Sequence, residues 1–367
     1  MKQKSLLLLA LFFYVPVLMA AEIRQLGQDY RSLAMGNTGI VTANSSAALF
    51  YNPATMANIS TWWIDLPMMQ LIYSDDTKAL VDQAKTGSFN LSTQTEQIDF
   101  MKSFVGKNPY VRFDLGVNWF INFDKKGFTA GGNYTYEALL DIAVRNPTMP
   151  EISLKSGLDH VRQVGVSVPL GLGKWILGIT RKQVERQSLD FTYSMADAID
   201  KKPFPTMAAN GLKGRGTGYD LGLLYRAPSA ARLMYGFVYR QKIKLGANQE
   251  IPEEVAFGVA SVQSFGIGKW TGAVDWRDLT FKNASLGDKS INRRTHVGTE
   301  LSLIPFSENS NLLSLRAGYS QGHVSKGAEI SLGKVMVFGY TKYAEETGEY
   351  AGQNPSNRTV LYFSMGF

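Results

Sequence analysis

Hydrophobic and polar residues alternate along most of this 367-residue chain. Between Val111 and Phe123 the odd positions are apolar, whereas most even positions are polar or glycine. Segments around residues 219, 270, 297 and 313 repeat this two-residue period, which is typical of β-strands with one apolar and one polar face. Counting such segments predicts fourteen strands, at residues 61–74, 110–123, 127–142, 159–168, 174–186, 216–226, 232–243, 252–263, 268–280, 293–304, 311–321, 326–332, 335–343 and 358–367.

Two fold classes share this alternation, a soluble β-sandwich and a membrane β-barrel. Tryptophan and tyrosine recur near the ends of the apolar faces, as in the aromatic girdles at membrane interfaces. The other face carries glycines and charges of both signs, which suits a wet lumen lined by paired charges. These features favour an all-β chain that forms a transmembrane antiparallel β-barrel of about fourteen strands, with the sandwich as the alternative.

The N-terminus reads as an export signal. Two lysines precede an uncharged, leucine-rich run from Ser5 to Ala21. A membrane anchor needs roughly 20 apolar residues, so the run fits a cleaved signal peptide over residues 1–20 better than an uncleaved anchor helix. Together with the barrel pattern, this leader predicts the outer membrane of a Gram-negative bacterium as the location, with outer-membrane lipid as a partner.

The composition excludes several kinds of chemistry. The absence of cysteine rules out disulfides, thiolate metal sites and cysteine nucleophiles. Three histidines leave little for metal binding or general-base catalysis, and no hydrolase, phosphate-loop or zinc-protease motif occurs. The formal net charge of +7 is too dilute over this length to indicate nucleic acid. We therefore expect no enzyme, cofactor, metal or nucleic-acid partner.

One glycine-rich segment needs a separate interpretation. Gly214, Gly216 and Gly218 resemble a cofactor-binding loop. They precede a predicted strand with no helix behind them, unlike a dinucleotide-binding loop. We therefore interpret them as a turn or as the small-residue start of a strand.

Residues 21–60 do not alternate, and their motif carries a family resemblance. A glycine pair follows small and methionine residues, and a run of small residues then leads into an aromatic pair and Asn-Pro-Ala. This combination resembles the N-terminal region of the FadL/TodX family of outer-membrane transporters of hydrophobic compounds. The resemblance implies that residues 21–60 form a hatch, or plug, inside the lumen of a fourteen-stranded barrel built from residues 61–367, with short helices in its loops. The motif residues are Gly36, Gly39, Phe50, Tyr51, Asn52, Pro53 and Ala54.

The last predicted strand resembles the C-terminal signal that outer-membrane barrels present to the barrel assembly machinery. Apolar residues occupy every second position up to a terminal aromatic residue, which makes the assembly machinery an expected partner. The alternative is an ordinary edge strand. The residues of this assembly signal are Phe363, Met365 and Phe367.

Two further segments interrupt the alternation. The segment from Thr77 to Lys107 has apolar residues at helical spacing, and the segment from Ser194 to Gly216 is interpreted as a long loop with a short helix. The first of these segments, together with the closing region Glu345 to Glu349 and the strand after it, looks more like the shorter PorV-type and TraF-like relatives than like the long fatty-acid transporters. Bacterial barrels place long loops outside the cell, and the connections after predicted strands 1, 3 and 5 are long. The second segment then forms either a lid over the outer mouth or a solvated loop.

The third predicted strand contains a candidate lateral gate. In the fatty-acid transporters a kink in the third strand opens the wall beside the hatch. The resemblance therefore marks Gly131, Gly132 and Asn133, because adjacent glycines permit a bulge that breaks the strand ladder. The alternative is that these small residues give room to the hatch.

Two classes of function remain open. In the first, a hydrophobic molecule such as a long-chain fatty acid binds at an outer site and leaves sideways through the barrel wall, which is passive uptake. In the second, the barrel does not transport and instead docks or shuttles a protein partner, as a secretion or conjugation accessory. Apolar residues in the outer loops and hatch favour the first, and an exposed patch favours the second.

Overall fold

The computed structural model describes residues 25–44, 47–59, 62–85, 93–123, 127–146, 148–200, 202–246, 249–283, 289–307, 310–333, 335–348 and 350–366. The signal peptide proposed for residues 1–20 and the terminal Phe367 lie outside these ranges.

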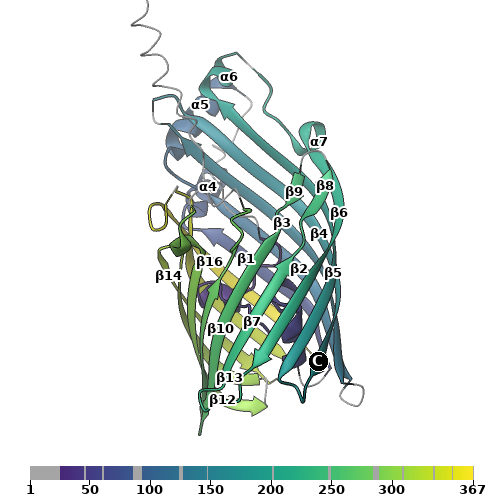
Figure 1. Ribbon diagram of the computed structural model, residues 1–367. Helices are drawn as coiled ribbons and strands as arrows, with labels where there is room; N and C mark the ends of the chain where they lie inside the picture. Colours follow the sequence, from purple (N-terminus) through teal and green to yellow (C-terminus); the bar gives the residue numbers. More distant parts are fainter. Residues whose placement is uncertain are drawn as a thin grey trace, which may run out of the picture.

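Fourteen antiparallel strands close into a barrel. Figure 1 shows its overall form. Neighbours in the ring follow the chain order, and β1 closes it by pairing with β16. The predicted fold class is confirmed. A separate hairpin, β8 (Ile243–Gly246) with β9 (Gln249–Ile251), lies between two barrel strands in the sequence. The barrel strands are β1 (Trp63–Ser74), β2 (Tyr110–Phe123), β3 (Phe128–Arg145), β4 (Glu151–Leu170), β5 (Trp175–Ser194), β6 (Leu212–Arg226), β7 (Leu233–Arg240), β10 (Glu254–Phe265), β11 (Gly268–Trp276), β12 (Thr295–Ser307), β13 (Ser310–Ser320), β14 (His323–Leu332), β15 (Met336–Glu346) and β16 (Pro355–Gly366).

The exterior of the barrel is apolar. Leu177 and Leu221, for example, are each 48% exposed, although both lie within regular strands. A contiguous apolar surface of this kind is expected where strands face lipid. Exposed aromatic residues form two levels on it, with Trp119, Trp175 and Trp270 towards one end and Tyr136, Tyr219 and Tyr319 towards the other.

The two ends of the barrel differ. One end carries only short turns, such as residues 171–174 between β4 and β5. The other carries the long connections, and we call these the turn end and the looped end. None of the described helices combines the length and apolarity needed to span a membrane. At the looped end lie α4 (Thr77–Lys85), α5 (Gln94–Phe104), α6 (Met195–Ile199), α7 (Met207–Asn210) and the 3-10 helix η4 (Ile291–Arg294).

One prediction about the connections is wrong. No long loop follows the third strand, because β3 continues to Arg145 and β4 begins at Glu151, so only residues 146–150 join them. The alternation is lost there because helices cover the exterior face of the extended strands. Ile142, Val144 and Ile152 are buried against Phe104 and its neighbours in α5.

Residues 195–200 and 202–211, which follow β5, pack against the extended strands. The ring of Phe204 packs edge-on against Phe191 of β5, with 5.0 Å between centroids, and Ala198 of α6 is fully buried. Hydrogen bonds from Lys202 and from Ser194 hold the pKa of the Asp197 carboxyl well below its usual range. The segment is therefore packed on the exterior face of β5, so its helices do not lie across the mouth as a lid.

Candidate functional site

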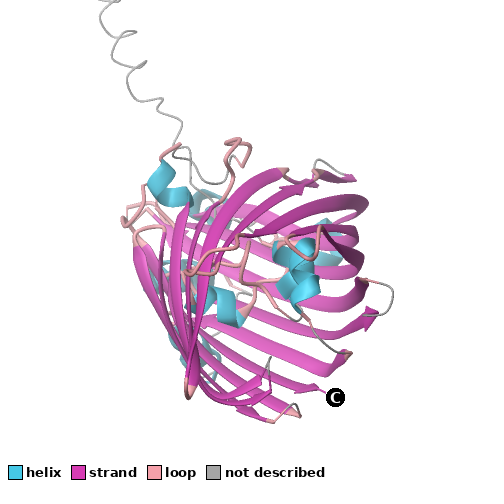
Figure 2. Ribbon diagram, turned by 60° about the horizontal axis from the view of Figure 1, so that its bottom comes forward, coloured by secondary structure: helices cyan, strands magenta, loops and turns pink. Residues whose placement is uncertain are grey.

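The described part of the N-terminal segment, residues 25–44 and 47–59, lies within the ring of strands, and we call it the hatch segment (Figures 1 and 2). It contains α2 (Tyr30–Ala34), α3 (Ala47–Tyr51) and the 3-10 helix η1 (Pro53–Asn58). Asp29 caps α2 by accepting the Ser32 backbone N–H at 2.8 Å, and Asn52 caps η1 by accepting the Ala54 N–H at 3.0 Å. These caps start helices that are too short to be stable alone, so the barrel wall must hold them.

A buried ion network fixes α2 to the wall. The Arg31 guanidinium donates to both Glu300 carboxylate oxygens, at 2.7 and 2.9 Å. Glu300 also accepts a hydrogen bond from Arg316 at 2.6 Å. Arg316 donates a second hydrogen bond to Glu329. The Glu329 carboxylate also accepts a hydrogen bond from the Tyr30 hydroxyl. Buried charges are tolerated when they are paired and hydrogen-bonded in this way. The network links the hatch segment to β12, β13 and β14.

Further polar contacts hold the middle of the hatch segment. The Asp275 carboxylate of β11 accepts the backbone N–H groups of Gly39 and Ile40, at 2.6 and 2.9 Å. Arg240 of β7 donates to the Tyr51 carbonyl at 2.6 Å. Because these bonds use backbone groups, they depend on the path of the hatch segment and not on its side chains.

A belt of lumen-facing glycines lets the hatch segment approach the wall closely. A Cβ on Gly178 would lie only 2.3 Å from the Ala54 nitrogen, and one on Gly222 only 2.0 Å from Asn52 Oδ1. Any side chain at these positions would displace hatch atoms. The ten strands of this glycine belt contribute Gly131, Gly165, Gly178, Gly222, Gly236, Gly258, Gly298, Gly318, Gly327 and Gly339.

The structure brings the predicted hatch motif together. The Tyr51 ring lies where a side chain on Gly39 would be, and its hydroxyl donates to Asn37 at 2.5 Å. Asn52 is fully buried and also donates to the Ile40 carbonyl at 2.8 Å. Gly36 has a φ of 67° and sits against the backbone of β12 and β13. Pro53 and Ala54 rest on β5 and β6, and Phe50 packs over Gly27.

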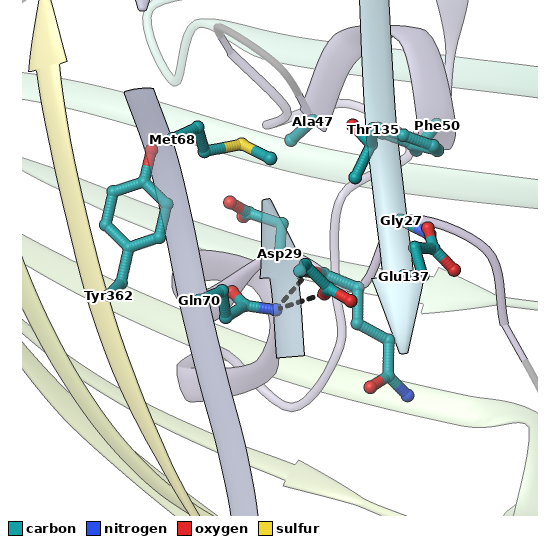
Figure 3. Close-up of a pocket in the computed structure, with 11 residues that line it drawn as sticks. Gly27, Asp29, Ala47, Phe50, Met68, Gln70, Thr135, Glu137 and Tyr362 are labelled. Atoms are coloured by element: carbon teal, nitrogen blue, oxygen red, sulfur yellow. Dashed lines mark hydrogen bonds between the residues drawn. The ribbon is translucent and has the colours of Figure 1, made fainter. Parts of the chain in front are cut away.

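A small cavity remains between the hatch segment and the wall (Figure 3). Gly27, Asp29 and Phe50 face it from the hatch segment, and Met68 and Gln70 face it from β1. The cavity has a volume of about 20 Å³, which is enough for roughly one or two water molecules. No hydrocarbon ligand fits there while the hatch segment is seated.

The candidate lateral gate at Gly131, Gly132 and Asn133 is wrong. These residues pair without a break with Phe120, Trp119 and Asn118 of β2, and with Gly165, Val164 and Gln163 of β4. Asn133 also hydrogen-bonds to Asn118 across the strands. The alternative explanation holds, because a Cβ on Gly131 would meet the Phe120 ring and the Met56 sulfur, while Trp119 covers Gly132 from outside.

The ladder is instead interrupted in β1. Its register shifts between Asp65 and Met68 against both β16 and β2, and Pro67 has no N–H to donate. Leu66 is 52% exposed on the barrel exterior. On the inner side, Ile59 of the hatch segment belongs to an apolar cluster that also includes Met56, Phe120 and Trp63.

The proposed assembly-signal residues lie in the last barrel strand. Phe363 of β16 packs against Phe338 of β15, with 5.1 Å between ring centroids, and Met365 pairs with Met336. Their role in assembly stays a prediction.

Sequence reasoning missed Arg31 and the hairpin β8–β9. Arg31 lies in a segment without periodicity, so the sequence pattern did not link it to Glu300 or to any other charge of the polar strand faces. Gly214 and Gly216 are strand residues, as expected, and a Cβ on either would collide with the hairpin at Leu245 and Lys244. Across the described residues, no group of three or more histidine or carboxylate side chains is placed to hold a metal.

Comparison with known proteins gives the fold. No protein-family model matches the chain, and no curated protein matches its sequence. The toluene transporter TbuX of Ralstonia pickettii aligns with 94% of this chain and 99% of its own, at a TM-score of 0.59 and 12% identity. A FadL homologue of Pseudomonas aeruginosa covers 95% and 99% at 0.56 and 12% identity. CymD, a monoaromatic hydrocarbon channel, covers 94% and 99% at 0.57 and 13% identity. The expected resemblance to the FadL/TodX barrels is thus confirmed at the level of the fold.

Proposed function

We propose that this chain is an outer-membrane channel for passive uptake of hydrophobic molecules, whose hatch segment closes the lumen to water and polar solutes. The observation that carries the proposal is the position of the hatch segment inside the ring of strands, where it packs against glycines of ten of them. A porin for polar solutes keeps a water-filled passage. A lumen that the hatch segment occupies suits a hydrophobic solute, because such a solute need not cross water and can leave through the barrel wall. The fold shared with TbuX and CymD supports the same function.

The looped end faces the outside of the cell in this proposal, because bacterial barrels place long loops outside and short turns in the periplasm. Apolar side chains gather at that end, where Phe100, Met101 and Phe104 of α5 pack with Tyr193 of β5. These side chains are buried, so the cluster holds α5 against the wall at the end where a ligand would arrive. Long-chain fatty acids and small aromatic hydrocarbons are the two ligand classes that we would test.

The β1 bulge is the exit in this proposal. The apolar cluster around Ile59 and Trp63 lies on its inner side, and Ile64 and Leu66 are exposed on its outer side. Backbone pairing resists opening elsewhere, because a buried N–H or C=O that loses its partner costs free energy. Between Asp65 and Met68, at Leu66 and Pro67, the regular register of that pairing is already interrupted.

Uptake can be tested in cells that lack channels of their own. Because the chain has no cysteine, Met69→Cys with Leu115→Cys introduces a single cross-strand pair beside the bulge. Expression of the wild type should increase entry of labelled oleate or toluene, oxidation of the pair should slow entry, and a reductant should restore it. Leu177→Cys with Leu223→Cys is the matched pair on β5 and β6 and should leave entry unchanged. The uptake proposal fails if wild-type cells take up neither ligand faster than cells without the protein.

A second candidate is a barrel that docks a protein partner. The continuous pairing of β3 at residues 131–133 favours it, because a lateral gate expected of a transporter is absent there. Cross-linking in intact cells separates the two candidates. A docking barrel gives one stoichiometric cross-linked partner through the looped end and no ligand uptake, whereas a channel gives uptake without such a partner.

A further inference from the structure

Two arginines lie on the barrel exterior, at the edge of the apolar wall that is nearer the looped end. Arg162 of β4 and Arg181 of β5 are exposed and have the strand parity of the lipid-facing residues Val164 and Ile179, which are 60% and 41% exposed. Charged side chains are costly on the lipid face of a barrel at mid-membrane and cheap only near its interfaces. Their position therefore marks the outer interface of the membrane.

Cross-strand register joins these arginines into one patch. Arg181 pairs with Val164, and Arg162 pairs with Gln183, two residues further along the same strand. The two arginines are therefore diagonal neighbours, a relation that separates residues by about 7–8 Å in an antiparallel sheet. Two guanidinium groups at that spacing can contact one phosphate or a pair of phosphates.

Tyrosines of the aromatic level nearer the looped end lie on both sides of the arginine patch. Tyr134 pairs with Arg162, whose guanidinium lies 5.4 Å from the centre of the Tyr134 ring. Tyr219 pairs with Arg181, and Tyr136 accepts the Tyr134 hydroxyl at 2.5 Å. Aromatic residues at this level belong where lipid headgroups begin. The stacking on Tyr134 leaves the guanidinium edge of Arg162 free to donate.

No acidic side chain neutralises the two arginines. The described carboxylate on this face at this level is Glu185, and its partner is Arg215, at 3.4 Å. The structure shows no ion pair for Arg162 or Arg181 within the described ranges. The patch therefore presents net positive charge directly above an apolar wall.

The same pattern recurs on another side of the barrel. Lys326 of β14 and Lys342 of β15 are exposed and lie directly opposite each other, one step above Tyr340. Like charges directly opposite in a sheet destabilise it. An anion bound between them would remove that cost.

We propose that the surface formed by Arg162, Arg181 and the flanking Tyr134 and Tyr219 binds the phosphates of a phosphorylated lipid in the outer leaflet. The occupant must offer an anionic headgroup beside apolar chains, because the cations border the lipid-facing wall. Guanidinium groups match phosphate oxygens with paired hydrogen bonds. The inference rests on the outer-membrane location proposed above, but it does not depend on what the channel transports.

The test measures lipid binding by the full-length barrel in mild detergent. The probes are a diphosphorylated glycolipid, its dephosphorylated form and inorganic phosphate, and the readout is native mass spectrometry with the unfolding temperature. The wild type should bind the diphosphorylated lipid and be stabilised by it, and should respond to neither of the other probes. Arg162→Gln with Arg181→Gln should weaken binding about a hundredfold, as expected for the loss of one charged hydrogen bond from each arginine.

Lys102→Gln with Lys244→Gln removes the same charge from exposed positions on α5 and β8 and should leave binding unchanged. Equal lipid binding by the arginine variant and the wild type would overturn the proposal. Equal stabilisation by inorganic phosphate would also overturn it, because the site would then recognise a free anion. Uptake measured in parallel separates this outcome from failure of the proposed function, since a folded arginine variant should still transport.

Discussion

Two sides of the hatch segment meet the barrel wall in different ways. At β12 and β13, Arg31 is held by a network of charges around Glu300. At β5 and β6, the segment Asn52 to Ala54 rests on glycine backbone with no side chain between. Charged contacts can rearrange and find new partners, whereas a backbone contact tolerates no added atom. The charged contacts should therefore respond gradually to substitution and the glycine contacts abruptly, including those that Gly298 of β12 and Gly318 of β13 make with the hatch segment.

Gly178→Val should have the largest effect. Its Cβ would lie 2.3 Å from backbone atoms of Pro53 and Ala54, which cannot move without unseating η1. We expect a loss of about 3 kcal/mol or more in stability and leakage of a small polar solute through reconstituted barrels. Gly266→Val is the control, because nothing lies within 4 Å of its Cβ position. Equal leakage by the two variants would show that the glycine side does not hold the hatch segment.

Glu300→Gln should have an intermediate effect. The substitution removes the carboxylate shared by Arg31 and Arg316, and hydrogen bonds to charged groups contribute about 1.5–3 kcal/mol each. We expect the unfolding temperature to fall while the barrel still forms. Glu185→Gln breaks an exposed pair with Arg215 and should cost less than about 1 kcal/mol. If both variants unfold at the wild-type temperature, the ion network does not anchor α2.

Asn52→Ala should have the smallest effect of the three. It removes the cap of η1 and the bond to the Ile40 carbonyl, and a lost cap costs about 1 kcal/mol. Proteolysis of the hatch segment should become faster without leakage. Thr206→Ala removes the cap of the exposed helix α7, and it should leave proteolysis of the hatch segment unchanged. A hatch segment as resistant in Asn52→Ala as in the wild type would contradict the role of this cap.

The strand pattern was largely predictable from the sequence because each barrel strand faces two different media. Apolar and polar residues therefore alternate with a period of two, as in β2 and β13. Prediction of the strands failed at the parts of β3 and β4 nearest the looped end. There helices bury the exterior face, so Ile142 and Ile152 face neither lipid nor water.

The hatch contacts were less predictable. The motif from Phe50 to Ala54 drew attention to the right segment, but a sequence does not say which lumen charge meets Arg31. The glycines at residues 131 and 132 illustrate the same limit. A glycine in a strand fits both a broken ladder and a close packing partner, and only the positions of Trp119 and Phe120 decide between them.

The most direct measurement is leakage of a small sugar from vesicles that contain the barrel with and without residues 22–58. The wild type should retain the sugar, because the hatch segment lies inside the barrel and packs against glycines of ten strands. The deletion should release it while still migrating as a folded barrel on unheated gels. A deletion that folds and stays sealed, or a wild type that leaks as fast as the deletion, would contradict the account that this segment closes the channel.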